Sequence, residues 1–328
     1  MRVLVTGGAG YVGSILVRVL LSKGYEVLCV DKLDFGGDSI VDLLRYPKFE
    51  FLNLNLLHAE EVREKLDDKE FHAVLHLAAI VGDPACKIDA ELSRRTNLEA
   101  SSQLLDIAVA KNVDKFVFAS TCSNYGKMDE AGGFVTEDSP LAPVSLYAEL
   151  KVEFEKKLLE VSNSGVDTCL TALRFATVYG LSPRMRFDLT VNEFTKEMAM
   201  GRTLTIFGEQ FWRPYCHVAD FSQAFLRVLE APKSAVDKQV FNVGSTDENY
   251  TKRMLADELM NVFPQGKIEY VVKNEDPRDY RVNCDKIGSV LGFEPTMVVL
   301  DGIREIADAL KLKVISNPDQ QRYFNIPV

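Results

Sequence analysis

Short apolar runs alternate with amphipathic stretches through the first half of the chain. Apolar runs of this length, rich in Val, Leu and Phe, are typical of buried strands, and we expect them at Val3–Thr6, Glu26–Val30, Phe49–Leu52, Ala73–Leu77, Lys115–Ser120 and Asp167–Phe175. Apolar positions with helical spacing predict helices at Val12–Ser22, Glu60–Leu66, Glu99–Lys111 and Leu146–Val161. Strands that alternate with helices predict an α/β fold built on a doubly wound parallel sheet.

After Gly180 this alternation becomes less regular, and prolines such as Pro183, Pro214, Pro264 and Pro295 separate shorter elements. Proline interrupts both helices and strands, so a smaller and less regular unit is expected there. We predict a first domain over residues 1–180, to which part of residues 214–245 returns. Residues 181–328 then form a smaller mixed α/β C-terminal domain.

Composition excludes several classes of protein. The formal net charge is −10 over 328 residues, which argues against nucleic acid as a partner, because phosphate backbones select basic surfaces. The longest apolar runs fall short of the roughly 20 residues that a membrane helix needs. The six cysteines are scattered without a CxxC pair, and His, Cys and Asp show no metal-ligand spacing. We therefore expect no metal, no membrane and a reducing, cytoplasmic location.

A glycine-rich turn joins the first strand to the first helix. Gly7, Gly10 and Gly13 stand between the run Arg2–Thr6 and an amphipathic helix. Glycine at these positions allows a tight turn and a close approach of the backbone to a pyrophosphate, which the helix N-terminus also attracts. The second strand leads into Asp31, which can accept hydrogen bonds from ribose hydroxyls and so favours NAD over NADP. Lys32 beside it is the one residue here that is more typical of an NADP site. The sequence predicts a Rossmann-type, NAD-binding first domain.

A tyrosine and a lysine one helical turn apart supply a candidate for acid–base chemistry. Tyr147 and Lys151 are four residues apart on a predicted helix, so they share one face. The ordinary pKa of a phenol, about 10, is too high for it to act as a base at neutral pH. A nearby ammonium group favours the ionised form, the phenolate. Thr121, at the end of a hydroxyl-rich strand, is placed to hold the hydroxyl that Tyr147 deprotonates. These three residues are the predicted catalytic group.

Over essentially its whole length the chain resembles the extended short-chain dehydrogenases/reductases of the NAD-dependent sugar-nucleotide epimerase/dehydratase family. The motifs are the glycine turn, the HxAA-type segment from His76 to Ala79, and Thr121, Tyr147 and Lys151. The resemblance implies that NAD is bound by Gly7, Gly10, Tyr11, Val12, Gly13, Asp31, Lys32, Asn55, Leu56, Leu77, Ala78, Ala79, Asn97, Tyr147 and Lys151. Many relatives have Asp where this chain has Asn55, which still accepts a hydrogen bond.

The same resemblance implies a nucleotide-diphosphate sugar as substrate and a homodimer formed through residues 99–111 and 146–161. Arg213, before a His-Val-x-Asp segment, and Arg278 match basic residues that contact the diphosphate. The substrate residues implied are Thr121, Ser123, Thr177, Arg184, Arg186, Arg213 and Arg278. Thr177 stands where asparagine is usual. Arg184 and Arg186 are expected to face the substrate, although a solvated basic turn explains them equally well.

The residues after Thr121 limit which of the family's reactions we expect. Dehydratases in the family have an Asp-Glu pair there, whereas this chain has Cys122 and Ser123. Cys122 is interpreted as a small structural residue. We predict a nucleotide-sugar epimerase that oxidises and re-reduces the sugar at C4. The main alternative is a hexose or heptose 4-dehydrogenase that releases the 4-keto sugar; a 4,6-dehydratase and a non-catalytic NAD-binding regulator remain as further hypotheses.

Overall fold

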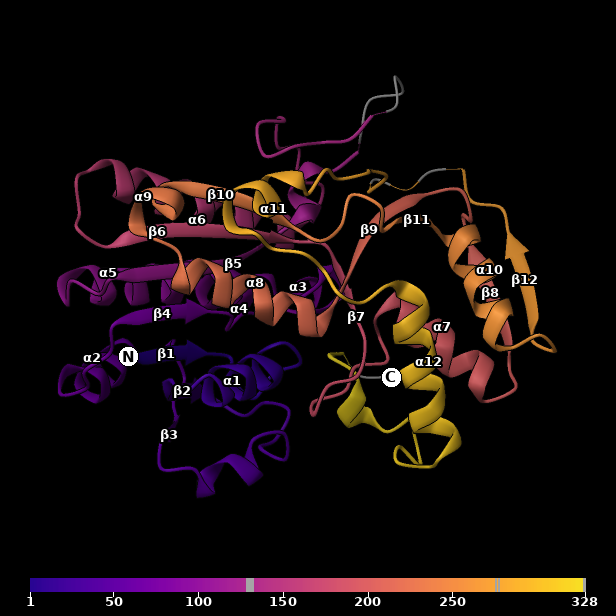
Figure 1. Cartoon of the computed structure of the whole chain (residues 1–328), viewed down its shortest axis with the longest axis horizontal. Helices are drawn as coiled ribbons and strands as arrows, with labels where there is room; N and C mark the ends of the chain where they lie inside the picture. Colours follow the sequence, from indigo (N-terminus) through magenta and orange to yellow (C-terminus); the bar gives the residue numbers. More distant parts are fainter. Residues whose placement is uncertain (128–132, 275, 277, 327–328) are drawn as a thin grey trace.

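Parallel strands form the centre of the larger of two packed regions (Figure 1). The computed structural model describes residues 1–127, 133–274, 276 and 278–326. The seven-stranded sheet has the order β10-β6-β5-β4-β1-β2-β3, and every neighbouring pair is parallel. Its strands are β1 (Arg2–Thr6), β2 (Glu26–Asp31), β3 (Phe49–Asn53), β4 (Ala73–His76), β5 (Lys115–Thr121), β6 (Cys169–Phe175) and β10 (Gln239–Val243).

Helices cover both faces of this sheet. One apolar core lies under α1 (Gly13–Ser22), α8 (Val218–Glu230) and α11 (Asp285–Leu291). The other core lies under α2 (Ala59–Asp67), α5 (Ser101–Ala110) and α6 (Leu146–Asn163). The shorter helical segments of this region are η1 (Val41–Arg45), α3 (Asp83–Ile88), α4 (Ala90–Arg94), the π-helix η2 (Arg95–Ala100), η3 (Cys122–Tyr125) and α9 (Lys233–Val236). The predicted doubly wound fold is confirmed.

The second region stands beside the carboxyl ends of the strands (Figure 1). A three-stranded sheet, β11-β9-β7, lies between the two regions, and the strands β12 and β8 pair at the far side. A separate core unites residues of α7, β8, α10 and α12. The elements are β7 (Thr177–Tyr179), α7 (Thr190–Ala199), β8 (Thr203–Phe207), β9 (Trp212–His217), β11 (Asn249–Thr251), α10 (Lys252–Val262), β12 (Lys267–Val271), α12 (Val299–Lys311) and η4 (Gln321–Tyr323).

The strands and helices expected from the sequence are present, with bounds that differ by two residues at most. The predicted helix at residues 99–111 begins inside the π-helix η2 and continues as α5. The chain also returns to the first region more extensively than residues 214–245 suggested. Ile287 of α11 and Phe293, which lie outside that range, also pack into the core under α1 and α8.

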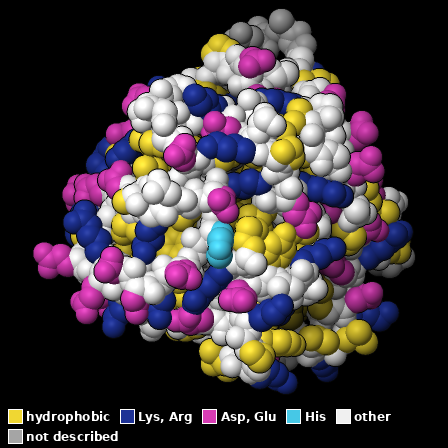
Figure 2. Space-filling view, turned by 60° about the vertical axis from the view of Figure 1, so that its left-hand side comes forward, with side chains coloured by type: hydrophobic (Ala, Val, Ile, Leu, Met, Phe, Trp, Pro, Cys, Tyr) yellow, Lys and Arg dark blue, Asp and Glu magenta, His cyan; other side chains and the backbone are white. Residues whose placement is uncertain are grey.

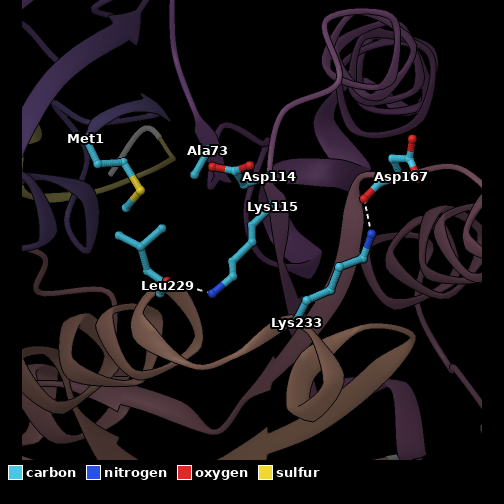
Figure 3. Close-up of a pocket in the computed structure, with 7 residues that line it drawn as sticks. All are labelled: Met1, Ala73, Asp114, Lys115, Asp167, Leu229 and Lys233. Atoms are coloured by element: carbon cyan, nitrogen blue, oxygen red, sulfur yellow. Dashed lines mark hydrogen bonds between the residues drawn. The ribbon is translucent and has the colours of Figure 1, made fainter.

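The amino ends of the strands form a different kind of surface. A hollow there is lined by residues that include Lys115 and Lys233 (Figure 3). The Lys115 ammonium donates to the carbonyls of Val228 and Leu229 at 2.9 and 2.7 Å, which neutralises the end of α8. Acidic and basic side chains are interspersed on the face shown in Figure 2. Lys115 therefore has a structural role at this edge of the sheet.

Candidate active site

The glycine turn between β1 and α1 lies at the carboxyl edge of the sheet, beside the point where the strand order reverses between β1 and β4. Gly7 has a φ of +75°, and a Cβ on Gly13 would lie 2.1 Å from the Gly7 carbonyl oxygen. The amides of Tyr11 and Val12 donate to no acceptor in the described part of the chain. Bare backbone with free N–H groups at a helix N-terminus fits a pyrophosphate.

Asp31 ends β2 beside this turn. Its carboxylate accepts hydrogen bonds from the amides of Ala9, at 3.0 Å, and Leu33, at 2.8 Å. Burial raises the pKa of Asp31, and these two amides oppose the shift. Lys32 points elsewhere and pairs with Asp34 at 2.6 Å. Asp31, which favours a ribose without a 2′-phosphate, is therefore fixed at the turn. The charge of Lys32 is already neutralised by Asp34.

The other residues expected to contact NAD follow β3 and β4 at the same edge. Asn55 and Leu56 come after β3, where the Asn55 side chain accepts from the Leu57 amide at 3.1 Å. The segment Leu77–Ala79 follows β4. Asn97, buried in η2, fixes this segment because its side chain accepts from the Ile80 amide at 2.8 Å and donates to the Ile80 carbonyl at 2.9 Å.

Thr121 ends β5, and Tyr147 and Lys151 lie in the first turns of α6. The two elements are held together by aromatic packing, with Phe118 and Phe154 ring centroids 4.5 Å apart. The Lys151 ammonium donates to the Ala119 carbonyl at 2.7 Å and lies 5.8 Å from the centre of the Tyr147 ring. The fold thus brings the three predicted catalytic residues to one end of β5 and α6.

The electrostatics of Tyr147 differ from the sequence-based expectation. Burial raises the pKa of the Tyr147 phenol, and Arg186 is the leading charge that opposes this rise. Burial also lowers the pKa of Lys151 to about 7, so the lysine is itself a weak source of positive charge in this environment. Desolvation of both groups therefore opposes the formation of a phenolate–ammonium pair.

Lys151 should make stability depend on pH in the absence of NAD. Between its folded pKa of about 7 and its ordinary value of 10.5, the unfolded chain binds a proton that the folded chain lacks. Stability should therefore rise with pH in this window, by at most about 1.4 kcal/mol per pH unit. Lys151→Met should lack that contribution. Urea unfolding of both proteins at several pH values between about 7 and 9 tests this, and parallel curves would contradict it.

The residues expected to bind a diphosphate meet on the side of the second region. Arg213, on β9, pairs with Asp276 at 2.9 Å, and its guanidinium lies 5.5 Å from the centre of the Tyr280 ring. Arg278 pairs with Asp83 of α3, also at 2.9 Å. Each arginine therefore has a carboxylate partner in this structure, and an anionic ligand must share or replace that partner.

The remaining predicted substrate residues are distributed around this group. The side chain of Ser123, next to the end of β5, lies near the hydroxyl of Tyr280 and opposes the rise in its pKa that burial causes. Thr177 lies in β7, in register with Tyr215 of β9. Arg186 binds Asp188 through two nitrogens, at 2.9 and 2.8 Å. Arg184 lies over the Phe35 ring, 3.9 Å from its centre, close to Asp31. The structure thus separates the two neighbouring arginines.

Three residues near Tyr147 were not among the predicted site residues. Asp83 and Cys86 on α3 and Tyr280 interact electrostatically with the phenol. Asp83 also accepts a hydrogen bond from Ser145, the residue that begins α6 by accepting from the Ala148 amide. Asp83 follows β4 directly by a short loop, so its place at the carboxyl edge could have been inferred from the predicted sheet.

Cysteine and histidine side chains around the site are buried and hydrogen-bonded within the fold. The Cys122 thiol is buried and donates to the Arg174 carbonyl at 3.1 Å, as a structural residue. His76 is hydrogen-bonded in the core to Thr6, and His217 to Glu305. All six cysteines are free. Among the described residues there is neither a cluster of His, Cys, Asp or Glu suited to a metal nor a helix long and apolar enough to cross a membrane.

A doubly wound sheet with a glycine turn, an acid after the second strand and a Thr-Tyr-Lys group defines an extended short-chain dehydrogenase/reductase. The chain belongs to the NAD dependent epimerase/dehydratase family, whose sequence pattern matches residues 3–244. It is therefore an enzyme of that family, and its cofactor is NAD. The glycine turn and Asp31 described above fit this cofactor.

Relatives in the family include both epimerases and dehydratases. Over 324 residues the chain is 30% identical to YtcB of Bacillus subtilis (strain 168), named an uncharacterized UDP-glucose epimerase, with 94% of this chain and 97% of the relative covered. It is 29% identical to the dTDP-glucose 4,6-dehydratase of Streptomyces niveus, covering 94% and 92%. UDP-glucose 4-epimerase of Thermotoga maritima, solved with UDP-glucose, has a TM-score of 0.83 and 28% identity, covering 96% and 100%.

Proposed function

We propose that the protein is a nucleotide-sugar 4-epimerase. The observation that supports this reaction most directly is the end of β5, where Thr121 is followed by the buried thiol of Cys122 and by Ser123, whose side chain lies near the Tyr280 hydroxyl. Elimination of water from a sugar needs an acid and a base beside the reacting carbons. A thiol directed at the Arg174 carbonyl and a serine do not supply that pair.

NAD, when bound, supplies reversible hydride transfer at the sugar's C4. Tyr147 takes and returns the proton of the C4 hydroxyl, and Thr121 holds that oxygen in place. Arg186 and Lys151 lower the cost of the phenolate. Burial and the nearby Asp83 carboxylate oppose ionisation of the phenol, and the positive charge that NAD⁺ would bring to the site would act against both effects.

Arg213 and Arg278 are proposed to bind the diphosphate of the substrate. Guanidinium groups bind phosphate oxygens through charge-assisted hydrogen bonds. Both side chains lie near Tyr280 or Asp83, which interact with Tyr147. A sugar attached to a diphosphate at that position extends towards the phenol. The relatives that act on UDP- and dTDP-sugars support this class of substrate.

Incubation with a panel of UDP-, GDP-, CDP- and dTDP-sugars tests the reaction. An epimerase converts one sugar into its C4 epimer without net NADH and without added NAD. Stoichiometric NADH with a 4-keto product would establish the dehydrogenase instead, and a 4-keto-6-deoxy product would establish a dehydratase. Absence of turnover with the whole panel, while NAD remains bound, would favour a binding protein without chemistry.

Arg213→Met should raise KM for the nucleotide sugar roughly 10- to 100-fold, because a charged hydrogen bond to the substrate is lost. The change in kcat and in NAD affinity should be small, since Arg213 lies on β9 and not beside the glycine turn. Asp276→Asn is the matched variant: it releases Arg213 from its carboxylate partner, so KM should fall or stay constant. Steady-state kinetics distinguishes the two, and an unchanged KM in Arg213→Met would refute the assignment.

A homodimer remains a prediction. The outward positions of α6 are the exposed residues Glu149, Glu153, Lys156 and Glu160, so an interface through this helix would contain charged side chains. Size-exclusion chromatography with light scattering would establish the number of subunits.

A further inference from the structure

The Arg184 side chain is an unpaired buried cation. It is 6% exposed, and its Nε and Nη2 atoms have no hydrogen-bond partner within the described residues. Burial and the charge of Arg186 lower the pKa of Arg184 to about 10. A buried guanidinium without a partner costs free energy. Arg186, two residues later, is instead bonded to Asp188, so the lack of a partner is specific to Arg184.

The loop that contains Arg184 is fixed against the glycine turn. The Ser182 hydroxyl donates to the Tyr11 carbonyl at 2.6 Å and lies 3.1 Å from the Ser14 hydroxyl. The Tyr11 hydroxyl donates to the Gly180 carbonyl. These contacts connect the helix side of the turn with the start of the second region, two residues before Arg184.

The guanidinium also lies at the end of β2. It stacks on Phe35, 3.9 Å from the ring centre, and interacts electrostatically with Asp31. Phe35 fixes the plane of the guanidinium from one side. Asp31 is already bonded to the amides of Ala9 and Leu33, so it does not provide Arg184 with a hydrogen-bond partner. The guanidinium therefore lies beside Asp31 at the end of β2, with its Nε and Nη2 atoms unpaired.

We propose that Arg184 binds the diphosphate of NAD, opposite the amides of Tyr11 and Val12. The amides and the end of α1 attract the phosphates from the first region, and the turn itself has no cationic side chain. Arg184 supplies that charge from the second region. NAD is then enclosed between the two regions and held through a whole catalytic cycle. The inference depends on NAD binding and not on which sugar reaction follows.

Affinity for fragments of NAD tests the proposal without reference to activity. Calorimetry on NAD-stripped protein should show ADP-ribose binding to Arg184→Met roughly 10- to 100-fold more weakly than to the natural protein, because a charge-assisted contact is lost. Adenosine, which lacks phosphates, should bind both proteins equally. Arg322→Met is the matched control: it removes an arginine that lines the same hollow as Phe35 but is 58% exposed, and ADP-ribose affinity should be unchanged.

Thermal unfolding provides a second readout. Because Arg184 is buried without a partner, NAD-free Arg184→Met should melt at the same temperature as the natural protein or higher, and the rise in Tm on adding NAD should be smaller. Affinity for ADP-ribose within twofold of the natural value would overturn the proposal. Equal weakening of adenosine and ADP-ribose would also overturn it, since the contact would then be with the nucleoside. A lower Tm with unchanged affinity would assign Arg184 a structural role.

Discussion

Tyr147→Phe is expected to lower kcat by about 10²- to 10⁴-fold, the usual contribution of a positioned acid or base. The variant keeps the ring and removes only the hydroxyl that exchanges a proton with the substrate. NAD affinity should change little, because the glycine turn and Asp31 are untouched. The measurement is turnover of the sugar identified in the panel, together with the NAD content of the purified protein.

Tyr25→Phe is the matched control for the loss of a phenol. The Tyr25 hydroxyl is bonded to Glu230 at 3.4 Å in an exposed setting, so its removal should leave turnover at the natural level. A Tyr147→Phe enzyme that retains more than about a tenth of the natural kcat would exclude general acid–base catalysis by this residue. Loss of bound NAD together with turnover would show instead that the variant damages the cofactor site.

Glu155→Gln is expected to destabilise the protein by about 3–5 kcal/mol, the usual cost of breaking a buried ion pair. Glu155 of α6 and Arg174 of β6 are 2% and 4% exposed, and the Arg174 Nε atom lies 3.1 and 3.2 Å from the two carboxylate oxygens. The same carboxylate accepts from Ser120 of β5 at 2.8 Å. Glutamine keeps the shape of the side chain but leaves the Arg174 charge uncompensated.

Glu153→Gln makes the same chemical change two residues earlier on α6. Glu153 pairs with Arg94 at 3.3 Å in an exposed position, so its replacement should cost less than about 1 kcal/mol. Urea unfolding of both variants gives the comparison. Similar losses in the two would contradict the role of Glu155 as the group that fastens the catalytic helix to β5 and β6.

The larger part of the fold was predictable because its signals are local. Each strand from β1 to β6 is a short apolar run, and each intervening helix shows its own periodicity. The return of α11 was not predictable in this way. Ile287 and Phe293 pack under α1 and α8, and an apolar residue on a short helix does not reveal which of two cores it joins.

The residues of the candidate site also differ in whether a local sequence signal predicts them. Gly7, Asp31, Thr121, Tyr147 and Lys151 occur in motifs or at strand ends, and the parallel sheet brings strand ends together. Tyr280 lies far along the chain in an irregular segment, and only the fold brings it to Ser123.

The sequence could not predict the pKa shifts or the separation of Arg184 from Arg186, for another reason. Both depend on burial and on partners such as Phe35 and Asp188, which belong to other segments of the fold. Spacing along the chain says only that two arginines are near each other, and not which ligand each one faces.

The position of β10 has a consequence for synthesis on the ribosome. This strand completes the large sheet beside β6, although residues 177–217 of the second region precede it in the chain. Until residues 239–243 emerge, β6, buried along its whole length in the finished protein, is an unprotected apolar edge, and such edges invite pairing with other chains. The large sheet is therefore complete only after residues 177–217 of the second region and then β10 have been synthesised.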